Sequence, residues 1–300
     1  MYVVIGATGH TGNTVAEKLL GKGEKVRVVG RDGRKLEPFR QKGAEVFVGD
    51  VTDAGAMERA FAGADAAYVM IPPNVASPNV LAYDDRVIDS LASAVQKNAV
   101  KQAVLLSSVG VDKPDKTGPV VGLRRLEQKL EAIAGLNVLS LRAGYFMENI
   151  LPQVAVIQSF GNMVGPVRAD LPLPMIATRD IGAAAAEALA RRDIQGKQRR
   201  ELLGARDVTY SEVAKVLGAA IGKPNLQYQQ FGAAQVKPAL MQMGMSANMV
   251  DLLLEMCDAL NSGYMRALEP RSAQNTTPTT IETFVGEVFV PAFRGQAARA

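Results

Sequence analysis

Six short apolar runs, each followed by a turn and then by a helical pattern, organise the first half of the chain. The runs are rich in Val, Ile and Leu and have few polar interruptions, which is typical of strands buried on both faces of a parallel sheet. They cover residues 2–5, 25–29, 45–48, 66–71, 102–106 and 137–141. Alternation of such strands with helices predicts an α/β fold with a doubly wound parallel sheet.

The helical patterns between these runs have the apolar spacing of amphipathic helices. They cover residues 15–20, 54–62, 80–97 and 121–133. The second half is less regular, with short strands expected at 175–178 and 201–203 and helices at 180–191, 210–218 and 281–290. Thr209 and Thr279 each precede a Glu by three residues, the spacing of a capping box. We expect a dinucleotide-binding domain over residues 1–150 and a smaller, mostly helical lobe over 151–300, with some segments returning to the sheet.

Methionines are concentrated in the helical patterns between residues 233 and 263. Two interpretations are open, because the flexible thioether side chain fills irregular gaps in a core or lid and also adapts to a bound ligand. The first predicts core filler, and the second predicts an adaptable apolar substrate wall. The residues concerned are Met241, Met243, Met245, Met249 and Met256.

The chain of 300 residues contains one His and one Cys. This excludes Cys/His zinc sites, Cys-ligated iron–sulfur clusters and a disulfide framework, and we expect no metal. A net charge of +4 is too small and dispersed to indicate nucleic-acid binding. No signal sequence and no apolar run near 20 residues is visible, so we expect a cytoplasmic protein without membrane contact.

The strongest motif follows the first apolar run and precedes the first helical pattern. It reads Gly6-Ala7-Thr8-Gly9-His10-Thr11-Gly12. Gly6 permits a tight turn, Gly9 lets backbone N–H groups approach a pyrophosphate, and Gly12 permits close packing of helix on strand. The helix N-terminus adds unpaired N–H groups and a positive dipole end. We expect Gly6, Thr8, Gly9, His10, Thr11 and Gly12 to bind a dinucleotide in a Rossmann-like domain, the alternative being a structural turn with an exposed His10.

The end of the second strand indicates which dinucleotide binds. An NAD site usually has an acidic side chain there, whereas this chain has Gly30 followed by Arg31. Arg31 and Lys35 are suited to a 2′-phosphate, which favours NADPH over NADH. Asp32 is the counter-argument, because its carboxylate could reach a ribose 2′-OH.

Other residues at strand ends are candidates for contacts with the rest of the cofactor. Asp50, followed by Val51, ends the third strand beside the expected adenine. Ile71 and Pro72 follow the fourth strand, where they could wall the cofactor or form a rigid turn. Ser107 and Ser108 end the fifth strand, where side chains face the nicotinamide in this fold or simply cap the strand.

Three segments together resemble the NmrA-like group of atypical short-chain dehydrogenases/reductases. They are the glycine loop, Ser107-Ser108-Val109-Gly110, and Leu141-Arg142-Ala143-Gly144-Tyr145-Phe146-Met147-Glu148-Asn149. The resemblance implies NADP(H) binding by the first domain, with Tyr145 and Phe146 beside the nicotinamide. It also implies a C-terminal lobe over a cleft. Members of the group are either reductases of quinones, dyes or phenolics, or NADP(H) sensors that act through a protein partner.

The chain departs from this pattern at the proton donor. None of its seven Tyr residues has a Lys four positions later, so the usual Tyr-x-x-x-Lys pair is missing. Reductases of the group often carry Lys or His four residues before a Glu in the following helix, and here that position is Leu123, before Glu127. Tyr145 and Ser107 are the candidate catalytic residues that remain, with packing and strand capping as their structural alternatives.

Two functions remain open. The favoured one is an NADPH-dependent reductase for an electron-poor aromatic or quinoid acceptor, such as a quinone or an azo or triphenylmethane dye, in which positioning carries most of the rate. The alternative is a non-catalytic NADP(H) sensor that acts through a regulatory protein partner. A sugar epimerase or dehydratase is disfavoured, because it needs the missing Tyr/Lys chemistry.

Overall fold

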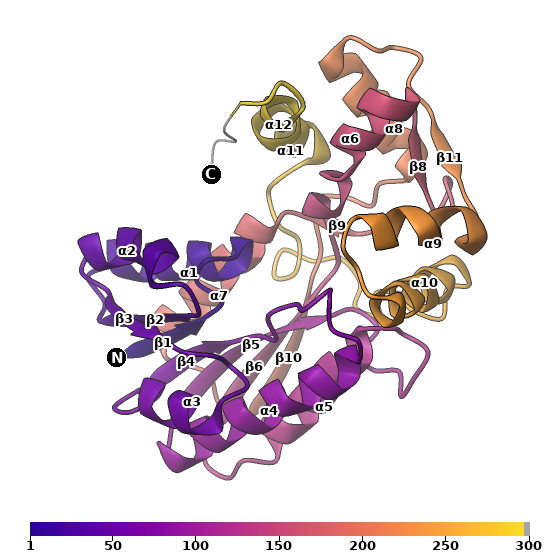
Figure 1. Cartoon of the computed structure of the whole chain (residues 1–300). Helices are drawn as coiled ribbons and strands as arrows, with labels where there is room; N and C mark the ends of the chain where they lie inside the picture. Colours follow the sequence, from indigo (N-terminus) through magenta and orange to yellow (C-terminus); the bar gives the residue numbers. More distant parts are fainter. Residues whose placement is uncertain (297–300) are drawn as a thin grey trace.

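The computed structural model describes residues 1–296, whose centre is a parallel sheet of seven strands (Figure 1). The strand order is β10-β6-β5-β4-β1-β2-β3, so the direction of winding reverses between β1 and β4. The strands are β1 (Tyr2–Ile5), β2 (Val26–Gly30), β3 (Glu45–Val48), β4 (Ala66–Val69), β5 (Gln102–Ser108), β6 (Asn137–Ala143) and β10 (Lys197–Leu202). A switch of this kind opens a crevice at the carboxyl ends of the strands.

Helices cover both faces of the sheet. One face carries α1 (His10–Gly21), α2 (Gly33–Gln41) and α7 (Thr178–Arg191), and the other carries α3 (Ala54–Ala60), α4 (Val80–Lys97) and α5 (Val120–Glu131). Alternate residues of the central strands belong to the two buried clusters: in β1, Val4 packs with the first set of helices and Val3 with the second. The predicted α/β doubly wound fold is confirmed.

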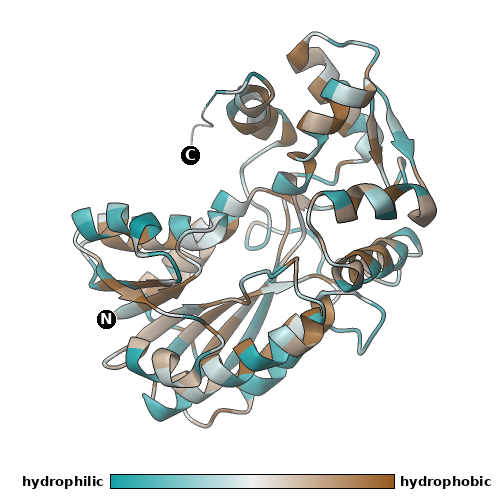
Figure 2. Ribbon diagram, in the orientation of Figure 1, coloured by the Kyte–Doolittle hydropathy of each residue, from teal (hydrophilic) through white to brown (hydrophobic). Residues whose placement is uncertain are grey.

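The remaining elements gather beyond the carboxyl ends of the strands, around a third buried cluster (Figures 1 and 2). Two-residue strands β7 (Tyr145–Phe146) and β9 (Met175–Ile176) pair with each other, and β8 (Met163–Gly165) pairs with β11 (Tyr228–Gln230). The helices are η1 (Met147–Ile150), α6 (Gln153–Phe160), α8 (Tyr210–Ile221), α9 (Ala233–Gln242) and α10 (Ala247–Asn261). The strand expected at 201–203 is β10, which begins earlier and extends the main sheet beside β6. The domain division at residue 150 stays a prediction.

The predicted capping box at Thr209 is present. Its hydroxyl accepts from the Glu212 N–H, and the Glu212 carboxylate accepts from the Thr209 N–H. The corresponding prediction at Thr279 is wrong by one residue, because Thr280 caps the last helix. Thr279 instead donates its hydroxyl and its N–H to Asp180 of α7.

The expected single helix at 281–290 is divided into three segments. It runs through α11 (Ile281–Phe284), a π-helical turn η2 (Val285–Phe289) and α12 (Val290–Phe293). Among the described residues, no helix is both long and apolar enough to cross a membrane.

Candidate functional site

The loop between β1 and α1 is held in place by contacts that glycine alone permits. Gly6 has a φ of +72°, and a Cβ there would lie 2.7 Å from the Met70 Sδ. A Cβ on Gly12 would lie 2.3 Å from the Gly6 carbonyl oxygen, so the helix crosses the strand end at backbone contact. The Gly9 N–H donates to the Gly6 carbonyl at 2.9 Å and closes the turn. A Cβ at Gly9 would meet its nearest atom at 3.4 Å, so the fold itself does not demand glycine there.

The N-terminus of α1 has the features of an anion site. Gly9 caps the helix without a side-chain hydrogen bond, and the first turn contains no acidic residue. The N–H groups of that turn and the positive dipole end are therefore available to a phosphate. Thr8 and His10 are exposed at the loop, whereas the Thr11 side chain is buried. Thr11 can therefore offer its backbone N–H but not its hydroxyl. The loop fits the pyrophosphate of a dinucleotide.

Basic residues surround Asp50 at the ends of β2 and β3. The Asp50 carboxylate accepts from the Thr52 N–H and hydroxyl, both at 2.8 Å. These hydrogen bonds, with a smaller effect of the nearby Arg31 and Arg86, lower the pKa of Asp50. Arg31 and Lys35 are exposed. Arg31, predicted to bind the 2′-phosphate, and Asp50, predicted to lie beside the adenine, are thus close to each other.

Asp32, the counter-argument for NAD, has a structural role. Its carboxylate accepts from the Arg34 N–H at 3.0 Å and caps α2. That oxygen is therefore occupied, which weakens the case for a bond to a ribose hydroxyl. Val51 is buried in the cluster on the far face of the sheet, and its predicted contact with the cofactor stays a prediction. Arg86 was not found from the sequence, because it comes from α4, about 36 residues after Asp50.

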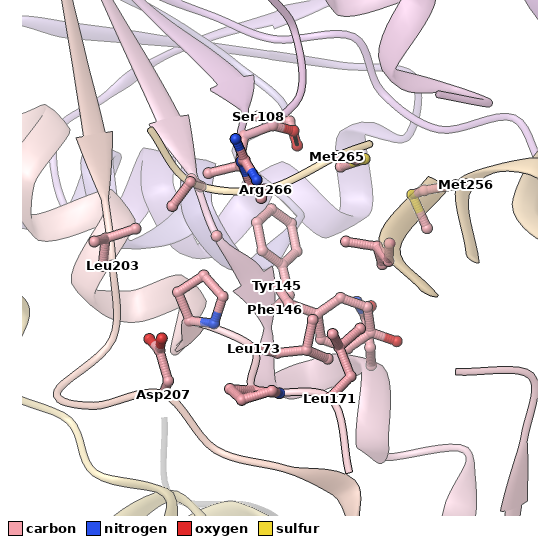
Figure 3. A pocket seen from close by; sticks show the side chains of 18 of the residues that line it. Ser108, Tyr145, Phe146, Leu171, Leu173, Leu203, Asp207, Met256, Met265 and Arg266 are labelled. Carbon is pink, nitrogen blue, oxygen red and sulfur yellow. Dashed lines mark hydrogen bonds between the residues drawn. The ribbon is translucent and has the colours of Figure 1, made fainter. Parts of the chain in front are cut away.

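Two adjoining cavities lie beyond the carboxyl ends of β4, β5 and β6. The smaller measures about 280 Å³ and is lined from the β4–α4 loop, α4, β5 and α5. The larger measures about 680 Å³ and is lined mainly by apolar side chains (Figure 3). Four residues line both: Ser108, Pro119, Phe146 and Met249. The predicted residues Ile71, Ser107 and Phe146 meet at the smaller cavity, but Pro72 does not line it.

Ser107 belongs to a buried network rather than to the open part of the site. Its hydroxyl donates to the Glu127 Oε1 at 2.6 Å, and Glu127 also accepts from Arg142 Nε at 3.1 Å and Nη2 at 2.8 Å. Ser107 and Glu127 are 1% and 4% exposed. The Ser107 proton is thus directed at Glu127 and not at a substrate oxygen. Leu123, one turn before Glu127, lines the smaller cavity with an apolar side chain.

Tyr145 lines the larger cavity but its hydroxyl is paired. It lies 2.9 Å from the Tyr210 hydroxyl, and the two rings meet edge to face. Tyr210 in turn stacks on Tyr228 with ring centroids 4.5 Å apart. Burial raises the pKa of Tyr145 to about 12. A phenol with this pKa is a poor acid at neutral pH, so the geometry favours the packing role over proton donation.

The methionines of residues 233–263, for which core filler and an adaptable substrate wall were both open, have different surroundings in the structure. Met249 and Met256 of α10 line the larger cavity, as an adaptable wall requires. Met241 and Met243, at the end of α9, are 45% and 55% exposed and form surface. Figure 3 shows Met256 and Met265 at one side of this cavity. In residues 1–296, no group of three or more His, Cys, Asp or Glu side chains is placed to hold a metal ion.

Comparison with known proteins places the chain in a family. Residues 2–285 match the model of the NmrA-like family. The chain belongs to the NmrA-like family. A protein of Streptomyces griseus named (4-alkanoyl-5-oxo-2,5-dihydrofuran-3-yl)methyl phosphate reductase is 30% identical over 241 residues, 80% of each sequence. An uncharacterized oxidoreductase of Bacillus subtilis is 24% identical over 263 residues, 87% of this chain and 85% of its own.

Two solved structures of similar fold contain a nicotinamide dinucleotide. An NADPH-dependent quinone oxidoreductase of Escherichia coli, complexed with NADPH, superposes with a TM-score of 0.79 at 24% identity, covering 95% of this chain and 98% of its own. The Citrobacter sp. triphenylmethane reductase complexed with NADP(H) has a TM-score of 0.77 at 17% identity, covering 99% and 100%. At these identities the likeness concerns the fold.

Replacing Arg31 should separate the two nicotinamide dinucleotides. Arg31→Ala is expected to raise the Kd for NADPH by roughly 10- to 100-fold, the effect of losing a charge-assisted hydrogen bond. The Kd for NADH should change by less than about twofold. Fluorescence titration measures both, and Arg34→Ala, whose side chain is 94% exposed, is the matched control. Equal effects of Arg31→Ala on the two Kd values contradict the assignment.

The buried network of Glu127 should contribute strongly to stability. Glu127→Ala leaves the Arg142 guanidinium, 17% exposed, without its partner. Loss of one partner of a buried pair costs about 3 kcal/mol or more, so the free energy of unfolding in urea should fall by that amount. Lys129 lies on the same helix as Glu127, and Lys129→Ala breaks only an exposed pair with Asp89 of α4, so it should cost less than about 1 kcal/mol. Similar losses for the two variants would show that the network adds nothing beyond a surface pair.

Proposed function

We propose that the chain is an NADPH-dependent reductase that transfers hydride to an electron-poor conjugated carbonyl acceptor, such as a quinone. The observation that carries this proposal is the large apolar cavity, which adjoins the smaller cavity at the carboxyl ends of β4 and β5. Within its family the chain is an NAD(P)H-dependent oxidoreductase. The identity of the acceptor is the proposed part.

The cofactor is NADP(H). The glycine loop and the open N-terminus of α1 are suited to its pyrophosphate, and Arg31 and Lys35 to its 2′-phosphate. The Escherichia coli and Citrobacter proteins of the same fold are complexed with NADPH and NADP(H). When bound, the reduced nicotinamide supplies a hydride. The chain contributes binding and orientation, which for an electron-poor acceptor supply most of the rate enhancement.

The lining of the larger cavity supports an acceptor with a flat apolar body. Leu171, Leu173 and Met256 contribute aliphatic and thioether surface, and Phe146 contributes an aromatic ring (Figure 3). A cavity of about 680 Å³ lies within the range of small-molecule sites. The Escherichia coli structure is of a quinone oxidoreductase and the Citrobacter structure of a triphenylmethane reductase, which supports acceptors of this class.

Charged side chains in the wall of the larger cavity indicate that the acceptor also carries a polar substituent. Arg271 and Arg266 both line the larger cavity. Arg271 is paired with Asp207, whereas among residues 1–296 Arg266 has no such ion pair. Glu201 holds the segment that carries Arg266, because its carboxylate accepts from the Leu268 and Glu269 N–H groups. We therefore propose that the preferred acceptor carries an anionic substituent. The name of the Streptomyces griseus relative describes a phosphate ester, in agreement with this choice.

The open cavity also bears on the sensor hypothesis. A sensor needs the dinucleotide site and a partner surface, but it has no use for an apolar cavity of this size beside the strand ends. The cavity therefore supports the reductase. An absence of turnover with every acceptor, despite NADPH binding in the micromolar range, would favour the sensor.

A panel of acceptors tests the proposal. NADPH oxidation, followed by absorbance, should occur with 1,4-naphthoquinone and with a sulfonated naphthoquinone, at a lower KM for the sulfonated compound. Arg266→Ala should raise the KM for the sulfonated compound by roughly 10-fold, because a charge-assisted contact is lost. The KM for the neutral compound should change by less than about twofold. A parallel rise in both KM values contradicts the role of Arg266, and absence of oxidation with both contradicts the reductase.

A further inference from the structure

The proposed reduction leaves one chemical requirement unmet. When a carbonyl acceptor gains a hydride, its oxygen becomes an anion and needs a proton. The candidates considered so far supply it poorly. Tyr145 is paired with Tyr210, the Ser107 proton is directed at Glu127, and Leu123 has no proton to give.

We propose, on the basis of the function proposed above, that Asp84 of α4 is the proton donor of this site. Asp84 lines the smaller cavity together with Ser108 and Phe146, the residues that also line the larger one. Its side chain is buried, with 6% of the residue exposed. The carboxyl group thus belongs to the wall of the smaller cavity, which adjoins the larger one.

A glycine on the neighbouring helix makes room for this carboxyl group. Gly122 of α5 lies against it, and a Cβ at that position would come within 2.4 Å of the Asp84 Oδ2. The next residue, Leu123, lines the same cavity. The Asp84 carboxyl therefore reaches across from α4 to the wall formed by α5.

Within residues 1–296, no hydrogen bond stabilises the ionised form of Asp84. Among the described residues, no side chain or backbone N–H donates a hydrogen bond to its carboxyl group. Arg125, the nearest guanidinium on α5, donates to Asp85 at 2.8 Å and 2.9 Å. On α3, Glu58 is paired with Lys97 at the far end of α4.

The electrostatic consequence is a carboxyl group that keeps its proton near neutral pH. Burial, with a smaller contribution from the Asp85 charge, raises the pKa of Asp84 to about 7, and Arg125 partly opposes this effect. Tyr83, the neighbouring titratable group, donates its hydroxyl to the Pro72 carbonyl. A pKa close to the working pH is what a general acid requires, because the group must both hold and release the proton.

The proton passes from Asp84 to the oxygen of the acceptor. The O–H bond of the Asp84 carboxyl breaks and an O–H bond forms on the acceptor oxygen, while both electrons arrive with the hydride. Asp84 is left as a carboxylate and regains its proton from water through the cavity. An enone needs this acid most, because its enolate is strongly basic. An electron-poor quinone needs it least, because its hydroquinone anion is weakly basic.

Asp84→Asn provides the kinetic test, because it keeps the size of the side chain and removes the acid. We expect kcat/KM for an enone to fall by roughly 100-fold, a typical contribution of general acid catalysis. For an electron-poor quinone it should fall by less than about fivefold. Asp89→Asn, which removes an exposed carboxylate of the same helix, is the matched control and should leave both values unchanged.

The pH profile of the wild-type protein is a second test that needs no variant. With the enone, kcat should decrease as the pH rises through about 7, because Asp84 loses its proton. Asp84→Asn should remove this decrease. If the wild-type protein reduces both acceptors and the variant retains the same rates and profile, the donor role is wrong but the reductase stands. If the wild-type protein reduces neither acceptor, the proposed function and the donor role are both wrong.

A measurement independent of turnover tests the protonation itself. The pKa of Asp84 is higher in the folded chain than the value of 3.8 expected when unfolded, so the folded state retains a proton that the unfolded state releases. This stabilisation is complete below about pH 4 and is lost as the pH rises through about 7. Relative to wild type, Asp84→Asn should therefore gain stability in urea between pH 5 and pH 8. No change in relative stability over this range would overturn the proposal.

Discussion

The close crossing of β1 and α1 is the contact on which the rest of the site depends. Gly12 brings the helix onto the strand end at backbone distance, and a methyl group there would separate them. A methyl group on Gly6 would meet the Met70 side chain. The same crowding continues to α7, where a Cβ on Gly182 would lie 2.7 Å from the Thr11 carbonyl oxygen. These contacts direct the open N-terminus of α1 to the carboxyl edge of the sheet.

Exposed basic residues lie at one end of that edge of the sheet, and a buried hydrogen-bond network lies at the other. Arg31 and Lys35 lie exposed at the end of β2, where the 2′-phosphate is expected. At the other end of the site, β5 and β6 are joined by the buried network of Ser107, Glu127 and Arg142. This network holds the strand ends rigid and leaves the cavities beside them largely apolar. We propose that the proton comes from Asp84, whose pKa is raised by burial.

Much of the fold could be predicted because local signals and tertiary packing agree. The apolar runs 2–5 and 45–48 coincide with β1 and β3, and the pattern at 80–97 coincides with α4. The expected burial on both faces holds for β1 but not for β3, because β3 lies at the edge of the sheet and its side chains are half-buried or exposed. The capping box at Thr209 was predictable because its partners are three residues apart. The cap at Thr280 was not, because the alternative residue, Thr279, is held by Asp180 from a distant helix.

The candidate site was predictable where it depends on one segment of chain, and not where it depends on several. The glycine loop could be interpreted from its own spacing. Asp84 gave no signal, because its burial results from the packing of α4 against Gly122, 38 residues later. The role of Ser107 was similarly hidden, since its partner Glu127 comes from another helix. Charge and spacing indicate the cofactor, whereas the acceptor depends on a cavity that assembles only in three dimensions.

Transfer of a labelled hydride from the cofactor to the acceptor is the direct test of the proposed reduction. NADPH carrying deuterium at its transferable position would be incubated with the protein and a conjugated carbonyl acceptor, and the product analysed by mass spectrometry. We expect one deuterium at carbon in a reduced enone, transferred from the labelled cofactor. Tight NADPH binding without label in any product would contradict the proposed reduction. The protein would then bind the cofactor without transferring its hydride.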